Sequence, residues 1–363
     1  YVNDSKVTNE LVHEAYDRMQ QEVRASHILV LVDEGASPQD TLKAYNKVLD
    51  VKKRLDAGED FIKVAQQFSE DPSVKENNGD LGYFSAFRMV YPFENAAYKT
   101  NVGQVSKPFR TRFGYHILKV VDKRVNRAEV TVAHIMILKQ NDAAQNEKAK
   151  TTIDDIYKKI QQGENFESLA QQFSEDKSSS AKGGVLQRFG SGQLSSEEFE
   201  NVAFELKDKN QISVPFQSQF GWHIVKLIEK HPVRTFDDMK FELEEKIRKD
   251  ERSLLITNSL AKKLRAKYTF TKDSKLIATI KGLVNDEFYT QTWVVPEKSK
   301  DLNGVVLTIN KDRKINSKVF LDFIASKQKS NIKTKPVARL VDELFEKFVD
   351  EQLITYYNDN LEN

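Results

Sequence analysis

The sequence predicts an α+β protein with two tandem copies of one domain, each a four-stranded antiparallel sheet with surrounding helices, followed by a mainly helical C-terminal region. Two observations support this fold class. FIKVAQQFSED at 61–71 recurs as FESLAQQFSED at 166–176, and FGYHI at 113–117 recurs as FGWHI at 220–224. Each copy therefore spans about a hundred residues, which is far longer than a solenoid repeat of ~20–45 residues.

Composition narrows the classes of function. The 363 residues contain 56 Lys and Arg against 54 Asp and Glu, so the net charge of +2 argues against a polyelectrolyte for nucleic acid or anionic lipid. There is no cysteine, which excludes disulfides, a thiol nucleophile and cysteine-ligated metal. The first residue is Tyr1, which indicates a processed or truncated chain. No apolar run approaches the ~18 residues of a transmembrane helix, so no spanning segment is expected in this fragment.

Within each copy the apolar pattern predicts the order β-α-α-β-α-β-β. The first strand carries one histidine, in SHILV at 26–30 and in AHIMI at 133–137. The last two strands alternate around Phe113-Gly114 and predict a terminal hairpin. Elements of the first copy are expected at 24–32, 38–57, 61–68, 93–98, 105–109 and 115–121, with counterparts at 129–138 and 143–162 in the second.

The flanking segments differ in character from the two copies. Apolar residues at helical spacing predict helices at 9–22, 235–267 and 337–357, and 304–310 resembles a strand. The predicted division is an N-terminal helical linker at 1–22, domains at 23–124 and 127–231, and a helical C-terminal region at 232–363 that could be a chaperone-type domain.

The residues argue against several common chemistries. Four of the six histidines occupy matched repeat positions, but no HExxH cluster is present, so no metal is expected. There is no Gly-x-Ser-x-Gly elbow and no P-loop or dinucleotide-binding fingerprint, so neither a serine hydrolase nor a nucleotide cofactor is expected. Acidic and basic residues alternate throughout, which argues against a nucleic-acid partner.

At the level of motifs, both copies resemble the parvulin (rotamase) domain of peptidyl-prolyl cis-trans isomerases. The first copy carries ASHILV at 25–30, FSED at 68–71, NGDLGYF at 78–84, MVYPFE at 89–94 and FGYHI at 113–117. Tandem parvulin domains with helical flanks resemble exported foldases and chaperones of the SurA/PpiD type. The resemblance implies prolyl isomerase activity without a cofactor.

In the first copy the resemblance assigns a complete set of site residues. It implies a catalytic network of His27, Asp71, Thr111 and His116, and an apolar cup for the proline ring made of Leu81, Met89, Phe93 and Phe113. Two structural readings stay open: the histidines could only link two strands, and Asp71 could only cap a helix end.

The second copy departs from the pattern. Its weaker site comprises His134, Asp176, Leu186, Leu194, Phe199, Ser218, Phe220 and His223. Gly-Asp-Leu-Gly-Tyr is replaced by Gly184-Val185-Leu186-Gln187-Arg188, Leu194 stands where methionine is expected, and Glu198 replaces the proline before the cup phenylalanine. This copy is therefore expected to bind peptide more than to isomerise it.

The resemblance implies a folding factor of the bacterial periplasm or cell envelope. Its expected partners are unfolded or proline-containing polypeptides, among them outer-membrane or secreted proteins. One alternative is a non-catalytic holdase that uses both domains as peptide-binding grooves. Another is a scaffold that binds one folded partner.

Overall fold

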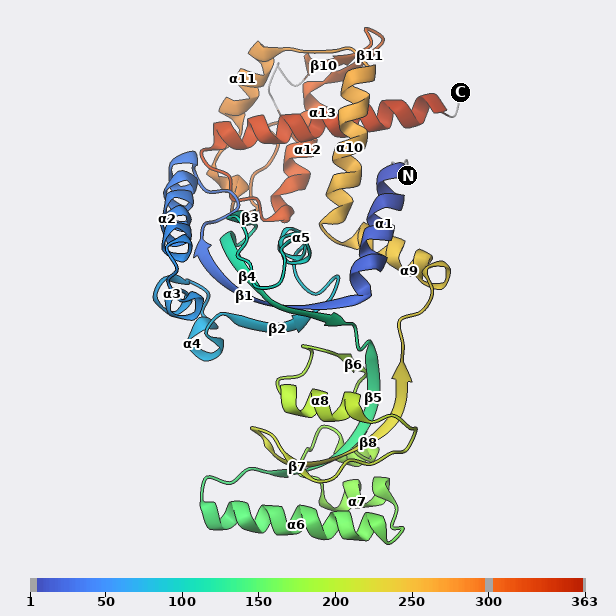
Figure 1. Ribbon diagram of the computed structural model, residues 1–363. Coiled ribbons are helices and arrows are strands. Elements are labelled where there is room, and N and C mark those ends of the chain that lie inside the picture. The colour runs from blue at the N-terminus through green and yellow to red at the C-terminus, as the bar shows by residue number, and fades with distance from the viewer. Residues whose placement is uncertain (1–4, 298–302, 362–363) are drawn as a thin grey trace.

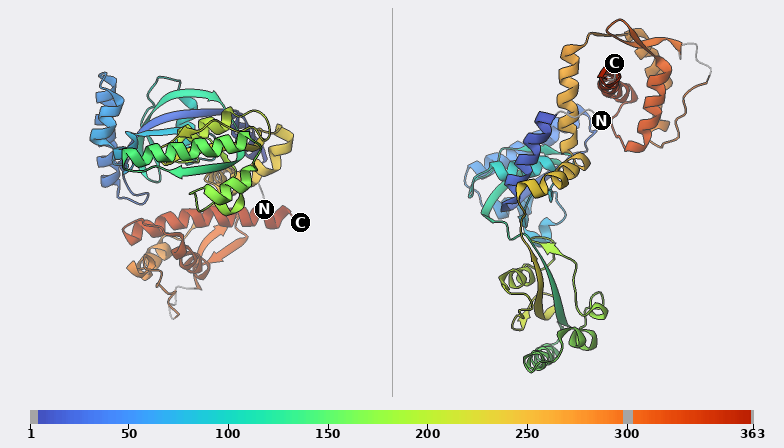
Figure 2. Two further views of the ribbon diagram at one scale, coloured as in Figure 1. Left: turned by 90° about the horizontal axis from the view of Figure 1, so that it is seen from below. Right: turned by 90° about the vertical axis from the view of Figure 1, so that its right-hand side faces the viewer.

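The computed structural model describes residues 5–297 and 303–361. The molecule is elongated, and three parts follow one another in space (Figures 1 and 2). Domain 1 (residues 21–125) lies in the middle, domain 2 (residues 129–231) lies at one end, and the C-terminal region lies at the other. Three helices, α1, α9 and α10, lie beside domain 1.

Domain 1 is a four-stranded antiparallel sheet of order β2-β1-β4-β3. Helices α2 and α3 pack on one face through Ile28, Val48 and Val64, while α5 packs on the other face through Phe93 and Leu118. Alternate residues of β1 and β4 therefore enter two separate cores. Its elements are β1 (Gln21–Leu31), α2 (Pro38–Asp56), α3 (Phe61–Phe68), α4 (Val74–Asn77), β2 (Asp80–Phe84), α5 (Tyr91–Lys99), β3 (Phe109–Thr111) and β4 (Gly114–Val125).

Local sequence signals explain where these helices begin. The Ser37 hydroxyl accepts a hydrogen bond from the Asp40 backbone N–H at the start of α2, and Pro38 fills the first helical position. Asp60 caps α3 in the same way, through the Lys63 N–H. Gly58 follows the end of α2 at φ +90°, a left-handed conformation that glycine adopts without strain.

Domain 2 repeats this topology with strand order β6-β5-β8-β7. Its outer strands β6 and β7 have two residues each, whereas β2 and β3 have five and three. Its elements are β5 (Glu129–Leu138), α6 (Ala143–Gln161), α7 (Phe166–Phe173), η1 (Ser180–Lys182), β6 (Phe189–Gly190), α8 (Glu197–Glu205), β7 (Phe216–Gln217) and β8 (Gly221–His231).

The helix module is defined as α1 (Ser5–Met19), α9 (Phe236–Lys249) and α10 (Arg252–Lys267), and it joins the N-terminal helix to the segment that follows domain 2. Leu11, Val12 and Ala15 of α1 share a core with Leu243 and Ile247 of α9. The helix predicted at 9–22 ends at Met19 because the chain already enters β1 at Gln21.

The prediction of one continuous helix at 235–267 is wrong. Helix α9 ends at Lys249, and Asp250 adopts an extended conformation with φ −115° and ψ −175°. The Asp250 carboxylate then accepts a hydrogen bond from the Arg252 backbone N–H at 2.7 Å. An aspartate that satisfies a free helical N–H in this way starts a new helix, so α10 begins at Arg252.

The C-terminal region combines helices with a three-stranded sheet of order β11-β10-β9. The strand predicted at 304–310 is β10, but its pairing with β9 and β11 was not predicted. Phe320, Phe345 and Phe348 form the centre of the core. Its elements are β9 (Phe270–Lys272), α11 (Ser274–Leu283), η2 (Asp286–Phe288), β10 (Val305–Ile309), β11 (Arg313–Asn316), α12 (Ser317–Lys327), η4 (Gln328–Ser330) and α13 (Val337–Leu361).

Across the described ranges 5–297 and 303–361, no helix combines the length and the apolar character needed to cross a membrane.

Candidate functional site

The histidine pair of domain 1 lies on its two central strands. His27 of β1 and His116 of β4 are two residues apart in register, because Leu29 is paired with His116 and His27 with Leu118. Their rings stack at a centroid distance of 5.4 Å with 20° between the planes. Both side chains are buried on the face of the sheet that α5 covers.

A continuous hydrogen-bond chain runs through this pair. Asp71 Oδ2 lies 2.6 Å from His27 Nε2, the Nδ1 atoms of His27 and His116 are 3.2 Å apart, and His116 Nε2 lies 2.7 Å from the Thr111 hydroxyl. At one end the Phe113 backbone N–H donates to Thr111 Oγ1, and at the other Ser73 donates its N–H and its hydroxyl to Asp71 Oδ1.

The direction of every bond follows from two conditions, that Asp71 is ionised and only accepts and that both imidazoles are neutral. His27 then donates through Nε2, and its neutral ring accepts at Nδ1. His116 must supply that proton from its own Nδ1, so its Nε2 accepts from the Thr111 hydroxyl. The chain is complete with both imidazoles neutral and one tautomer at each histidine.

The electrostatic environment favours these protonation states. Burial lowers the pKa of His116 to about 3, and the neighbouring His27 ring acts in the same direction. Burial also lowers the pKa of His27, although the Asp71 carboxylate opposes the shift. For Asp71, burial alone would raise the pKa, but the hydrogen bonds from Ser73 and His27 together hold it below its ordinary value.

Aromatic rings enclose the histidine pair. Phe93 of α5 presents its ring at 80° to both imidazoles, at 5.5 Å from each, and Phe109 of β3 stacks on His116 at 5.3 Å. Phe109 was not among the predicted site residues. Pro108-Phe109 recurs as Pro215-Phe216 at the same spacing as the histidines, and this repeat was the signal that could have found it.

The remaining predicted cup residues lie around this cluster. Leu81 and Met89 are partly buried and pack against the core that contains Phe93. Phe113 stands on the turn between β3 and β4 with 48% of its surface exposed, and the Arg112 guanidinium lies 4.9 Å from its ring centroid. The structure thus gathers Leu81, Met89 and Phe93 beside the histidines, whereas Phe113 lines a groove between domain 1 and the C-terminal region.

Domain 2 reproduces the cage of rings. His134 Nε2 lies 2.7 Å from Asp176 Oδ2, and His223 Nε2 lies 2.6 Å from the Ser218 hydroxyl. Phe199 presents its ring to both histidines, at 5.4 and 5.2 Å, and Phe216 stacks on His223 at 5.3 Å.

In domain 2 the hydrogen-bond chain is interrupted between the two histidines. The rings of His134 and His223 are 5.7 Å apart, and both Nδ1 atoms are buried without a hydrogen-bond partner among the described residues. Ser178 donates to Asp176 Oδ1 as Ser73 does to Asp71, and Asp176 has one additional donor, since the Ser179 hydroxyl donates to its Oδ2. Burial lowers the pKa of His223 to about 3, as it does for His116.

An apolar cavity of about 250 Å³ opens above the histidines of domain 2. Four residues of the predicted site, Leu186, Leu194, Phe199 and Phe220, line it together with Met136, which was not among the predicted residues. Met136 follows His134 by two residues on β5 and therefore lies on the same face of the sheet. The cavity is the place in this domain where an apolar ring can bind.

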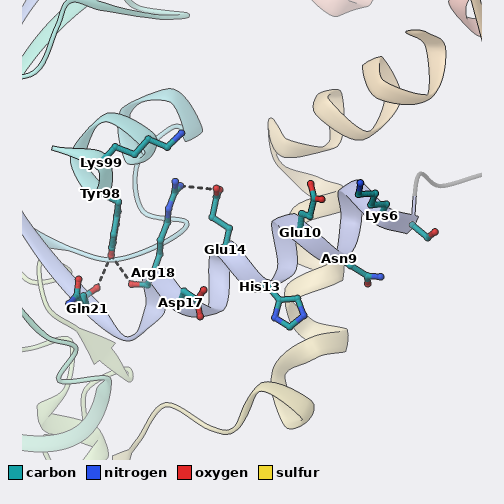
Figure 3. Close-up of a pocket in the computed structure, with 11 residues that line it drawn as sticks. Lys6, Asn9, Glu10, His13, Glu14, Asp17, Arg18, Gln21, Tyr98 and Lys99 are labelled. Atoms are coloured by element: carbon teal, nitrogen blue, oxygen red, sulfur yellow. Dashed lines mark hydrogen bonds and ion pairs between the residues drawn. The ribbon is translucent and has the colours of Figure 1, made fainter. Parts of the chain in front are cut away.

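Two further features lie outside these clusters. A groove of about 930 Å³ runs along α1 and the end of α5, is lined mainly by polar side chains and touches neither histidine pair (Figure 3). In the part of the chain that the structure describes, no group of three or more His, Asp or Glu side chains is placed to hold a metal ion.

Comparison with known proteins identifies the family. The model of the PPIC-type PPIASE domain (Rotamase) matches residues 27–122 and 134–229. The chain is 35% identical to Chaperone SurA of Methylococcus capsulatus over 213 residues, which cover 58% of this chain and 46% of that protein. It is 45% identical to Foldase protein PrsA of Geobacillus kaustophilus over 127 residues, which cover 35% and 41%.

Among solved structures, the peptidylprolyl isomerase PrsA of Bacillus anthracis is 36% identical, with coverage of 37% of this chain and 59% of that chain and a TM-score of 0.25. The chain spans about half the length of the curated relatives that it matches. The two family matches together cover more than half of the chain and coincide with the two sheets. The chain therefore belongs to the parvulin family, with two PPIC-type domains in tandem.

Proposed function

We propose that the chain is a peptidyl-prolyl cis-trans isomerase and folding factor, and that domain 1 carries the catalysis. The observation that carries this proposal is the continuous hydrogen-bond chain from Thr111 to Asp71 beneath an apolar cup. In this proposal His27, Asp71, Thr111 and His116 are the catalytic network, and Leu81, Met89, Phe93 and Phe113 hold the proline ring.

The chemistry requires no covalent step. Rotation about an X–Pro bond faces a resonance barrier of about 20 kcal/mol, because the planar imide has partial double-bond character. An apolar cup disfavours the charge-separated planar form relative to the less polar twisted form, which lowers the barrier by differential binding. Neutral His27 and His116 add no charge beside the imide, and their fixed tautomers hold the cup floor and Asp71 in place.

We propose that domain 2 mainly binds peptide. Its cavity of about 250 Å³ and its ring cage support binding of an apolar or prolyl side chain. The unpartnered Nδ1 atoms of His134 and His223 support a lower catalytic rate, because neither ring is held by the other. The proposed site here comprises His134, Asp176, Leu186, Leu194, Phe199, Ser218, Phe220 and His223.

The proposed partners are unfolded, proline-containing polypeptides, including secreted or outer-membrane proteins, in the periplasm or cell envelope of a bacterium. Relatives whose names read chaperone and foldase support this assignment. We also propose the division of the chain at 1–22, 23–124, 127–231 and 232–363, which the positions of the two sheets support.

The test is cis-trans relaxation of a short X–Pro peptide in the presence of the full chain. We expect acceleration by the unaltered chain and a loss of most of it in Met89→Ala, because the cup then holds the ring loosely. The matched change Leu194→Ala in domain 2 is expected to lower the rate less. An unaltered chain that leaves the relaxation rate at its spontaneous value contradicts the proposal.

The interrupted chain of domain 2 favours a second function, a holdase that binds clients without isomerising them. Suppression of the aggregation of an unfolded client distinguishes the two functions. If suppression survives in Met89→Ala while isomerisation is lost, the two functions are separate. If the unaltered chain suppresses aggregation and never accelerates isomerisation, the holdase is the only function of the two.

A further inference from the structure

A buried carboxylate directly follows a cup residue in domain 1. Glu94 is fully buried on α5, next to Phe93. Its Oε1 accepts the backbone N–H of Phe87 at 2.8 Å, and its Oε2 pairs with Arg18 of α1 at 2.7 Å and with Arg252 of α10. A buried carboxylate needs such partners, because an unpaired buried charge is strongly destabilising. Glu94 thus connects the cup segment to two helices of the helix module.

Arg252, the first residue of α10, holds this segment at several points. Its side chain is 1% exposed, and it pairs with Glu94 and with Asp250. Its guanidinium also lies 4.3 Å from the ring centroid of Phe87 and 4.4 Å from that of Tyr91. Residues 87–94 are therefore fixed at both ends and near the middle by one side chain from outside the domain. The cup residues Met89 and Phe93 lie within this segment.

Phe87 occupies a backbone conformation that disfavours a large side chain. Phe87 has φ +67°, a left-handed conformation that is strained for a bulky residue. In domain 2 the equivalent position is Gly192 at φ +80°, and its N–H donates at 3.0 Å to Glu200, the counterpart of Glu94. Domain 2 therefore makes the same turn without strain. Domain 1 keeps a phenylalanine, whose ring packs against Arg252 and the core of the helix module.

Arg18 has a counterpart in domain 2, namely Arg127. Arg18 donates to Asn95 at 2.5 Å and lies 5.5 Å from the ring centroid of Tyr98 (Figure 3 shows Arg18 with Tyr98 and Glu14). Arg127 repeats this arrangement in domain 2, with Asn201 at 2.8 Å and the ring centroid of Phe204 at 4.3 Å.

The carboxylate partners differ between the domains. Glu200 accepts the backbone N–H groups of Gly192 and Leu194 from its own loop. Glu94 accepts only the Phe87 N–H from its own loop and takes its remaining partners, Arg18 and Arg252, from the helix module. The carboxylate of domain 2 is thus held by its own loop, whereas that of domain 1 takes its partners from the helix module. The domain 2 segment has outside partners too, but they come from domain 1, where Arg24 pairs with Glu197 and Arg124 donates to Ser191.

We propose that Arg252 is a positioning residue for the cup of domain 1, so that the helix module sets the shape of this cup and not that of domain 2. The proposal deepens the proposed function, since it identifies what regulates the geometry of that same site. A displacement of α10 relative to domain 1 moves Phe87, Tyr91 and Glu94, and with them Met89 and Phe93.

Methionine methyl groups give a direct test in the full chain. Met89 lies in the cup of domain 1, Met136 lines the cavity of domain 2, and the other two methionines, Met19 and Met239, belong to or pack against the helix-module core. In Arg252→Met the spectrum of a chain carrying ¹³C-methyl methionine should show a shifted or broadened Met89 signal and an unchanged Met136 signal. The introduced methionine is identified by its absence from the unaltered chain.

Catalysis provides the second readout. With Arg252→Met we expect kcat/KM for an X–Pro peptide to fall about tenfold, because small misplacements of binding groups are costly to rate. Phe87→Gly is the variant that separates position from stability. It removes the strain at φ +67° and also the ring that Arg252 contacts, so we expect the thermal midpoint to hold while Met89 shifts and kcat/KM falls.

The matched control is Arg127→Met in domain 2, which should leave Met89 and the isomerase rate as they are. If Phe87→Gly and a folded Arg252→Met both leave the Met89 signal and kcat/KM unchanged, the proposal is wrong. If Arg252→Met does not fold, Phe87→Gly alone decides by the same criteria. A chain without any isomerase activity contradicts the proposed function, whereas the Met89 signal still decides whether Arg252 positions the cup.

Discussion

Domains 1 and 2 place the same histidines in the same cage of phenylalanine rings, but only in domain 1 are the two imidazoles joined by a hydrogen bond. The distance between the two imidazole centroids differs little between the domains, 5.4 Å in domain 1 against 5.7 Å in domain 2. A hydrogen bond weakens steeply with distance and angle, so a small displacement separates a continuous network from two separate halves. Identical residues at matched positions therefore do not guarantee identical networks.

The surroundings of the two sites differ as well. Domain 1 packs against the helix module through Glu94, Arg18 and Arg252. It also contacts the C-terminal region, where Arg339 donates to the Ala36 carbonyl at 3.1 Å. Domain 2 lies at the far end of the molecule (Figure 1). The two copies thus differ in what holds the cup segment: the helix module in domain 1, and in domain 2 its own loop together with Arg24 and Arg124 of domain 1.

The largest effect is expected from removing the phenylalanine that stands at the equivalent position of each cup. Phe93→Ala and Phe199→Ala each remove a buried phenylalanine, and each should cost its domain about 3–5 kcal/mol in the free energy of unfolding. Chemical denaturation of the full chain measures both changes. Isomerase activity should be lost with Phe93→Ala and largely kept with Phe199→Ala. Equal losses of activity would show that the two sites contribute alike.

Acid should destabilise both domains alike. Burial lowers the pKa of His116 and His223 to about 3, against an ordinary value of 6.5. Between these two values the unfolded chain binds more protons than the folded one. The free energy of unfolding is therefore highest with respect to these histidines above pH 6.5, and it decreases as the pH falls below that value. We expect roughly 1–2 kcal/mol per buried imidazole by pH 5.

Urea denaturation at pH 7.5 and pH 5.0 measures this loss, and the methyl signals of Met89 and Met136 report which domain responds. A stability that stays constant between these pH values would contradict neutral, buried histidines. Loss of only one of the two signals would show that the domains differ in this respect.

A smaller effect is expected when the hydroxyl that binds the second histidine of each domain is removed. Thr111→Val and Ser218→Ala leave a buried imidazole Nε2 without its hydrogen-bond partner, at a cost of about 1–3 kcal/mol in either domain. In domain 1 the loss should also reduce the isomerase rate, because the tautomer of His116 is no longer fixed and the bond to His27 depends on it. Unchanged isomerase activity in a folded Thr111→Val would mean that the hydrogen-bond chain of domain 1 contributes to stability only.

The smallest signal is spectroscopic. The proton shared by the Nδ1 atoms of His27 and His116 should exchange slowly with solvent and show a coupling between the two nitrogens. His134 and His223 should show no such coupling, because their Nδ1 atoms have no partner in the described part of the chain. Imidazole ¹⁵N spectra of the histidine-labelled chain measure this difference. A coupling in both domains would remove the distinction on which the different roles rest.

Most of the candidate site was predicted from the resemblance to the parvulin family, and the repeat shows which of its residues recur in domain 2. His27 and His116 were placed on neighbouring strands, and the structure pairs those strands with the histidines two residues apart in register. The ring of Phe109 and the side chain of Met136 were missed. They come from elements that meet the histidines only in the folded sheet, although Pro108-Phe109 and Pro215-Phe216 repeat at the same spacing.

The sequence by itself determined the two α+β domains and the order of their elements, because apolar periodicity and caps act over a few residues and the repeat shows them twice. The candidate residues of both sites were assigned by the resemblance to the parvulin family. Tertiary structure alone decided the joining of β9 to β10, the hydrogen bond between His27 and His116 and the clamp of Arg252 on Glu94. Each of these depends on the packing of distant segments to within a fraction of an ångström, and local patterns do not encode that distance.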